Sequence, residues 1–91
     1  MKKHFSIRVS GKVQGVFFRA STKQKANDLG LTGFVKNERD GSVYIEAEGN
    51  DAELNMFIEW CRTGPPSARV DYCEIEQGEV NEFKDFIINK S

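Results

Sequence analysis

The chain has 91 residues, of which 38% are hydrophobic and 30% are charged, and its 13 Lys and Arg nearly balance its 14 Asp and Glu. This length supports one domain with one core, and the composition excludes a disordered, fibrous or membrane-spanning chain. We therefore expect residues 1–91 to form a single soluble globular domain.

The N-terminal sequence MKKHFSIRVSGKV predicts a strand and not a targeting signal. Residues His4 to Ser10 alternate, so Phe5, Ile7 and Val9 share one buried face. A signal peptide would need an unbroken apolar run after the two lysines, and none follows. We therefore expect a cytoplasmic protein that makes no contact with a membrane.

The segment GKVQGVFFR, residues 11–19, joins this strand to a helix predicted from about Phe17 to Leu29. Gly11 and Gly15 permit positive φ, so successive backbone N–H groups can converge on an anion at the positive end of the helix. Arg19 lies in the first helical turn, where the dipole disfavours a cation, and its guanidinium can bind two phosphate oxygens. The segment predicts an anion site rather than a plain turn. It is not a Walker loop, because it has no GK[ST] sequence.

A β-hairpin is predicted after the first helix, which Gly30 ends as a C-terminal cap. Leu31 to Asn37 and Val43 to Glu48 are the two strands, and Asp40-Gly41 is a strong turn signal between them. Asn37 has two interpretations. It is either an ordinary residue before a turn, or an amide that accepts from and donates to one water molecule beside a phosphorus atom.

The second helix is the clearest predicted element. Asn50 is placed to cap it, with Glu53 completing a capping box, and Gly64 with the following Pro-Pro pair ends it. Its apolar stripe follows the i, i+3, i+4, i+7 rule and consists of Leu54, Phe57, Ile58 and Cys61.

Two closing strands, Val70 to Glu76 and Phe83 to Ile88, complete the order β-α-β-β-α-β, with the final segment as a short extra strand. Right-handed crossovers then place both helices on one face of a mainly antiparallel sheet. We therefore predict the α+β class and a ferredoxin-like α/β sandwich. This fold supports many functions, so function depends on the site.

The other reactive residues do not suggest a second site. Cys61 and Cys73 are twelve residues apart without a CxxC pair, and only one histidine is present. We expect two reduced, packed thiols and no metal, although a Cys–Cys pair is sterically possible. His4 is expected to be solvated at the start of a strand, not a phosphohistidine nucleophile. Four carboxylates at alternate strand positions are expected on a solvated sheet face: Glu46, Glu48, Glu74 and Glu76.

Charge is distributed unevenly along the chain. Residues 1–39 hold nine Lys or Arg against two Asp or Glu, a balance of +7, whereas residues 40–91 hold four against twelve, a balance of −8. This asymmetry fits either two solvated faces or an anion site framed by the first half of the chain.

Two separate motifs resemble the signatures of the acylphosphatase family. Residues 9–19, VSGKVQGVFFR, are similar to its phosphate loop, and residues 33–37, GFVKN, with Gly41, Val43 and Gly49, resemble its second signature. Residues 64–70, GPPSARV, are similar to the family segment after the second helix. The resemblance covers essentially the whole chain.

This resemblance implies metal-independent hydrolysis of acyl phosphates to a carboxylate and inorganic phosphate by a monomer without a cofactor. Arg19 and the loop N–H groups would bind the phosphate, and Asn37 would position the attacking water. The implied phosphate-binding residues are Gln14, Gly15, Val16, Phe17, Phe18 and Arg19. Acetyl phosphate, carbamoyl phosphate and 1,3-bisphosphoglycerate share the reacting group, and the sequence favours none of them.

Two other classes of protein are compatible with this fold or this loop. An RNA-recognition module is disfavoured, because the RNP1 pattern is missing and an acidic sheet face would repel nucleic acid. A domain that senses a phosphorylated metabolite without turnover would use the same loop. Asn37 favours the enzyme, because a pure binder needs no amide to hold a water molecule opposite Arg19.

Overall fold

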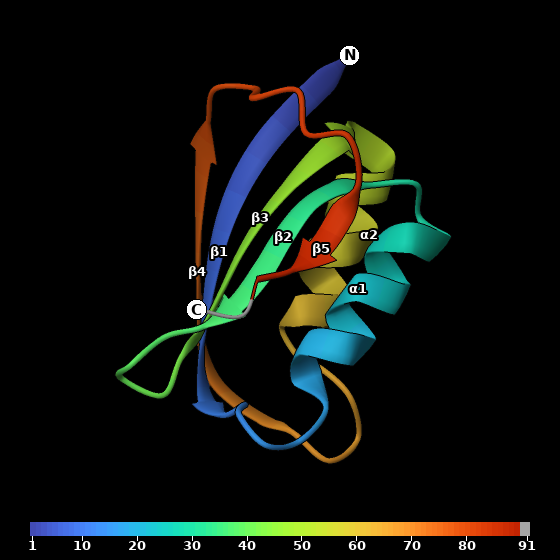
Figure 1. The fold of residues 1–91 in the computed structure, drawn as a ribbon. Helices are drawn as coiled ribbons and strands as arrows, with labels where there is room; N and C mark the ends of the chain where they lie inside the picture. The colour runs from blue at the N-terminus through green and yellow to red at the C-terminus, as the bar shows by residue number, and fades with distance from the viewer. Residues whose placement is uncertain (90–91) are drawn as a thin grey trace.

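The computed structural model describes residues 1–89, which form two layers: a five-stranded sheet and two helices that cover one of its faces (Figure 1). The strand order is β4-β1-β3-β2-β5, in which β5 runs parallel to β2 and the other pairings are antiparallel. The predicted ferredoxin-like α+β sandwich is therefore confirmed. The elements are β1 (Lys2–Lys12), α1 (Phe18–Asp28), β2 (Thr32–Asn37), β3 (Val43–Asn50), α2 (Asp51–Cys61), β4 (Arg69–Gly78) and β5 (Phe86–Ile88).

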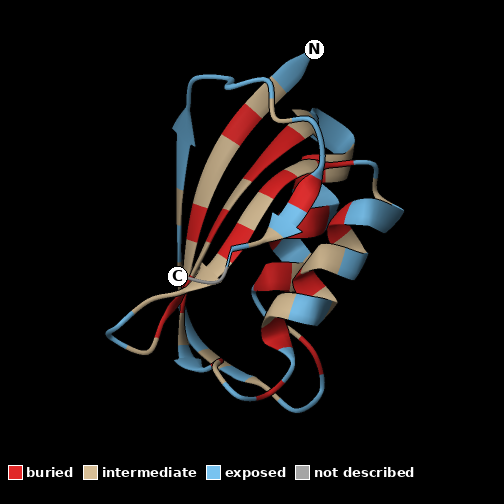
Figure 2. Ribbon diagram, viewed as in Figure 1, coloured by how far each residue is buried: buried red, intermediate tan, exposed pale blue. Residues whose placement is uncertain are grey.

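The core lies between the sheet and the helices. Buried positions alternate along the central strands, as period-2 patterning requires, and Figure 2 shows this alternation together with the buried inner faces of both helices. The predicted stripe of α2 is buried at all four positions, Leu54, Phe57, Ile58 and Cys61. No helix within residues 1–89 has both the length and the apolar character needed to cross a bilayer.

The helices end where the sequence predicts, but one of the predicted capping interactions does not form. Gly30 follows α1 with a φ of 71° and donates its N–H to the Asn27 carbonyl, as a C-terminal cap does. Asn50 occupies the N-cap position of α2 but makes no side-chain capping hydrogen bond, so the predicted capping box is wrong. Asp51 and Glu53 in the first turn stabilise this end through the helix dipole instead.

The open face of the sheet carries a buried cluster that the sequence analysis placed in solvent. His4 is 5% exposed and Glu48 is 1% exposed, so both expectations were wrong. His4 Nδ1 lies 2.8 Å from Glu48 Oε2, and His4 Nε2 lies 3.2 Å from Glu46 Oε1. Glu74 and Glu76 are exposed, as predicted.

The segment joining β4 to β5, residues 79–85, explains this burial because it crosses one end of the sheet (Figure 1) and contacts Glu48 there. Glu48 accepts hydrogen bonds from the backbone N–H of Asn81 and, at 3.1 Å, from that of Phe83. The Phe83 ring also lies 6.0 Å from the His4 ring, centroid to centroid. Residues 81–83 are therefore held over the open face, and β5 begins at Phe86 and is shorter than the predicted strand 83–88.

Replacing Glu48 with glutamine should lower the free energy of unfolding by about 3 kcal/mol at neutral pH, because a buried hydrogen-bonded ion is replaced by an amide with fewer acceptors. Burial raises the pKa of the Glu48 carboxyl, but the hydrogen bonds from two backbone N–H groups and from His4 outweigh it and leave the pKa lowered. The stabilisation is therefore complete above the ordinary pKa of about 4.3 and is lost as pH falls through the lower folded value.

Urea denaturation of both proteins between about pH 7 and pH 3 measures this effect. The wild type should lose stability steeply on acidification, and the Glu48→Gln variant should lose less. The matched control is Glu76→Gln, which changes an exposed carboxylate on β4. Equal acid dependence in the wild type and the Glu48 variant would contradict the assignment.

Candidate active site

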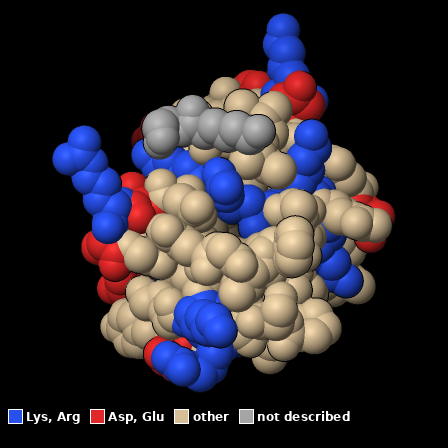
Figure 3. Space-filling model, turned by 60° about the horizontal axis from the view of Figure 1, so that its bottom comes forward, with Lys and Arg blue, Asp and Glu red and all other residues tan. Residues whose placement is uncertain are grey.

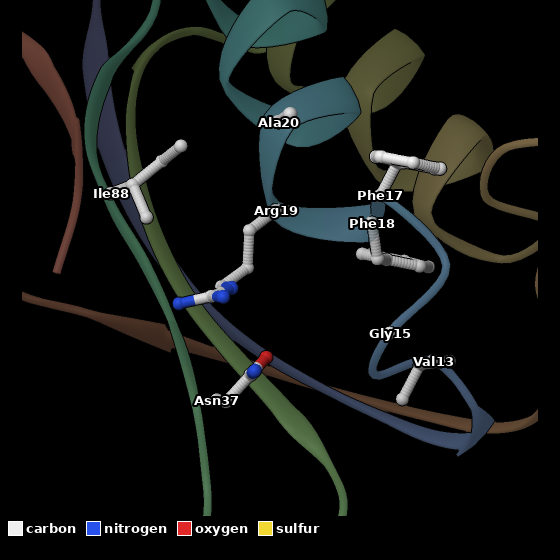
Figure 4. Close-up of a pocket in the computed structure, with 8 residues that line it drawn as sticks. All are labelled: Val13, Gly15, Phe17, Phe18, Arg19, Ala20, Asn37 and Ile88. Carbon is white, nitrogen blue, oxygen red and sulfur yellow. The ribbon is translucent and has the colours of Figure 1, made fainter. Parts of the chain in front are cut away.

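The β1–α1 loop and the end of β2 enclose a cavity of about 300 Å³ at one end of the molecule (Figure 4). The cavity brings together Arg19 and Asn37, the two residues that the sequence analysis selected, from different elements. Among residues 1–89 the rest of its lining is apolar or glycine and contains no carboxylate or imidazole. The lining residues are Val13, Gly15, Phe17, Phe18, Arg19, Ala20, Asn37 and Ile88.

The loop backbone has the conformation of an anion-binding nest. Gly15 and Phe17 are left-handed, with φ values of 74° and 63°, and Val16 between them is not. Such alternation turns successive N–H groups to one side. None of the N–H groups of residues 14–17 donates to a backbone carbonyl within residues 1–89. Since Phe17 is not glycine, its positive φ is strained, and such strain concentrates at functional sites.

The outer side of the loop is fixed by the segment after α2. The Ser67 hydroxyl donates to the Val16 carbonyl at 2.8 Å, which holds that carbonyl away from the cavity. Phe18 is buried against Trp60 and against Gly64, where a Cβ would come within 2.5 Å of the Phe18 ring. This contact of Ser67 was not predicted, although Ser67 lies in the third segment that resembles the family.

Arg19 extends from the first turn of α1 towards Asn37 (Figure 4). That turn contains no acidic residue. Among the ion pairs formed within residues 1–89, none includes Arg19. The guanidinium and the helix dipole therefore both favour an anion here.

Asn37 is the last residue of β2 and pairs with Val43 of β3. Its Oδ1 atom is buried and has no hydrogen-bond partner within residues 1–89. An unsatisfied buried acceptor costs about 1–3 kcal/mol, so such an atom calls for a functional explanation. The amide faces the same cavity as the Arg19 guanidinium (Figure 4).

The side chain of Gln14 has a contact that the sequence analysis did not foresee. Its Nε2 donates to the backbone carbonyls of Glu38 and Ser42, at 2.8 and 2.9 Å. Of the hydrogen-bond donors of Gln14, only the backbone N–H therefore remains available to an anion in the loop. The side chain instead joins the loop to the β2–β3 hairpin.

The turn of the hairpin that follows Asn37 is held by internal hydrogen bonds. Asp40 Oδ1 accepts hydrogen bonds from the Ser42 N–H and hydroxyl, at 2.9 and 2.6 Å, and Gly41 supplies a φ of 94°. These bonds, first of all that from the Ser42 hydroxyl, lower the pKa of the Asp40 carboxyl. The predicted turn at Asp40-Gly41 is confirmed.

Charge on this end of the molecule is segregated. Figure 3 shows Lys and Arg side chains spread over the face that contains the loop, with Asp and Glu gathered towards its edges. The positive electrostatic potential of these side chains attracts anions to this face.

The other reactive side chains lie outside the cavity. Cys61 and Cys73 are both free thiols, and burial raises the pKa of each, which disfavours the nucleophilic thiolate. No group of three or more His, Cys, Asp or Glu side chains within residues 1–89 is arranged to hold a metal ion.

These features define a small α+β domain in which a glycine-containing loop leads into a helix N-terminus, and known proteins resemble it in sequence and fold. The acylphosphatase family model matches residues 5–88. The acylphosphatase of Marinobacter nauticus is 53% identical over 81 residues, which cover 88% of this chain and 88% of that protein. The acylphosphatase of Mannheimia succiniciproducens is 55% identical over 74 residues, covering 81% and 80%.

Solved structures agree with these relatives. The structure of an acylphosphatase from Coxiella burnetii matches with a TM-score of 0.94 at 41% identity and covers 97% of this chain and 93% of that one. The acylphosphatase from Bacillus subtilis matches with a TM-score of 0.93 at 34% identity, covering 98% and 99%. The chain therefore belongs to the acylphosphatase family and is an acylphosphatase enzyme.

Proposed function

We propose that the chain hydrolyses the carboxyl–phosphate bond of acyl phosphates without a metal ion. The loop N–H groups of residues 14–19 and the Arg19 guanidinium hold the phosphate, and Asn37 holds the attacking water. The observation that carries this proposal is the buried, unpartnered Asn37 Oδ1 in the same cavity as Arg19.

Phosphate binding follows from the donors that surround the cavity. The left-handed conformations of residues 15 and 17 favour convergence of successive N–H groups on one anion, and Arg19 adds a fork of two further donors. Charge in the phosphoryl-transfer transition state spreads over the equatorial oxygens, where these donors act. Positioning and electrostatic stabilisation are then the main contributions of the protein.

Water positioning is assigned to Asn37. Its Oδ1 accepts a hydrogen bond from the water, which supplies the missing partner, and its N–H₂ group donates to the oxygen of the same water molecule. An amide is too weak a base to remove the proton. The water oxygen forms the new bond to phosphorus, and its proton passes to a phosphate oxygen.

The chemistry of the leaving group explains why no acidic side chain of residues 1–89 is needed in the cavity lining. The bond between phosphorus and the acyl oxygen breaks to release a carboxylate, which is a weak base and departs without a proton. A phosphate monoester must expel an alkoxide and needs a general acid. The site therefore favours mixed anhydrides over monoesters.

The test is hydrolysis of benzoyl phosphate by the wild-type chain in excess EDTA. We expect full turnover with the chelator, competitive inhibition by inorganic phosphate and no measurable hydrolysis of phenyl phosphate. Benzoyl phosphate without protein gives the background rate. Loss of turnover in EDTA that zinc or magnesium restores would refute metal independence. Tight phosphate binding without turnover would instead favour the sensing domain.

A further inference from the structure

The Gln14 side chain is the only side-chain hydrogen-bonding link between the loop and the hairpin within residues 1–89. Both of its amide hydrogens are used, one on Glu38 O and one on Ser42 O. Glu38 directly follows Asn37, and Ser42 directly precedes Val43, the strand partner of Asn37. Gln14 thus bonds to the residue after Asn37 and to the residue before Val43, the two neighbours of the Asn37–Val43 strand pair.

The strands alone do not provide this link. Pairing between β1 and β3 ends at Val9 and Val43. Beyond a bulge at Ser10/Gly11, β1 pairs only with β4, at Gly11 and Lys12. The loop therefore begins next to β4 and not next to the β2–β3 hairpin. The Gln14 side chain makes the hydrogen bonds that connect the loop to the hairpin.

We propose that Gln14 is a positioning residue, which acts through Asn37 by fixing the hairpin relative to the phosphate-holding loop. This inference rests on the proposed function. The phosphate contacts all belong to one continuous segment, residues 14–19, whereas the water contact belongs to the hairpin. Breaking the Gln14 link therefore moves the water relative to the phosphorus atom and leaves the phosphate contacts in place.

The expected consequence is a loss of turnover without a loss of phosphate affinity. Attack requires the reacting atoms to be aligned at about 3–3.5 Å, and a misplacement of about 1 Å can cost a hundredfold in rate. Gln14→Met keeps the length of the side chain and removes both donors. We expect it to lower kcat for benzoyl phosphate by about tenfold or more and to change the inhibition constant of inorganic phosphate by less than about twofold.

A double-mutant cycle with Asn37→Ala distinguishes this role from a general weakening of the loop. If Gln14 acts through Asn37, Gln14→Met should lower kcat about tenfold in the wild-type background and less than about twofold in the Asn37→Ala background. Equal losses in both backgrounds would overturn the proposal. So would a phosphate affinity that falls in step with kcat, because the nest itself would then depend on Gln14.

Two further variants complete the test. Gln24→Met makes the same substitution at an exposed position of α1 and should leave kcat unchanged. Gln14→Asn keeps both donors but shortens the side chain by one methylene, and it should show the same kcat loss if Gln14→Met does not fold. A wild type that turns over no benzoyl phosphate would refute the proposed function, whereas an active wild type with an unaffected Gln14→Met would refute only this inference.

Discussion

Replacing Arg19 with alanine should lower kcat/KM for benzoyl phosphate by about a hundredfold or more and abolish inhibition by inorganic phosphate. The guanidinium is the only charged group that lines the cavity within residues 1–89, and in the proposed mechanism it supplies two of the donors to the phosphate. The change also removes a cation from the N-terminus of a helix, so stability should be retained or rise by about 0.3–1 kcal/mol. Steady-state kinetics and urea denaturation measure the two effects.

Matched variants separate charge from geometry at this position. Arg19→Lys keeps the charge but loses the planar fork and should recover only part of the activity. Lys23→Ala removes a cation one turn later on α1, outside the cavity lining, and should leave kcat/KM unchanged. An Arg19→Ala variant with near-normal kcat/KM would show that the backbone N–H groups alone bind the phosphate.

Replacing Asn37 with alanine should lower kcat by about a hundredfold and leave the inhibition constant of phosphate within about twofold. The amide is assigned to the water and not to the phosphate, so only turnover depends on it. The substitution also removes a buried unsatisfied acceptor, and stability should not fall. Kinetics with phosphate as inhibitor, together with urea denaturation, measure all three quantities.

The control for this variant is Asn27→Ala, on the exposed side of α1, which should leave kcat unchanged. The combination of low kcat, normal phosphate affinity and undiminished stability is specific to a group that positions water. If phosphate affinity were lost together with kcat, Asn37 would be a phosphate ligand, and the roles of the two residues would have to be reassigned.

Most of the fold could be predicted because local signals agree with each other. The alternation in β1, the apolar stripe of α2 and the Asp40-Gly41 turn each require one type of element, and their order allows few topologies. Element ends were less accurate. The Asn50 capping box failed because a cap depends on the rotamer of one exposed side chain, which the spacing of residues does not determine.

The part that escaped prediction depends on contacts between distant segments. His4 and Glu48 look like solvent-facing strand residues, because nothing near them in the sequence shows that residues 79–85 will cover them. The link from Gln14 to the hairpin spans 24 and 28 residues and escaped for the same reason. The nearness of Arg19 and Asn37 could be predicted because each lies at the end of a predicted element, beside a turn that limits its position.

The position of β5 gives the buried cluster of His4, Glu46 and Glu48 a second role, in protecting the edge of the sheet. β5 forms one edge of the sheet and occupies backbone groups of β2 that would otherwise remain unpaired. If protonation of Glu48 frees the segment that leads into β5, the three-residue strand loses its anchor and β2 becomes the outermost strand. An edge strand with unpaired backbone N–H and C=O groups can pair with a strand of another molecule. The ionised carboxylate therefore protects the protein against aggregation at neutral pH, and a concentrated solution should lose this protection when acid protonates Glu48.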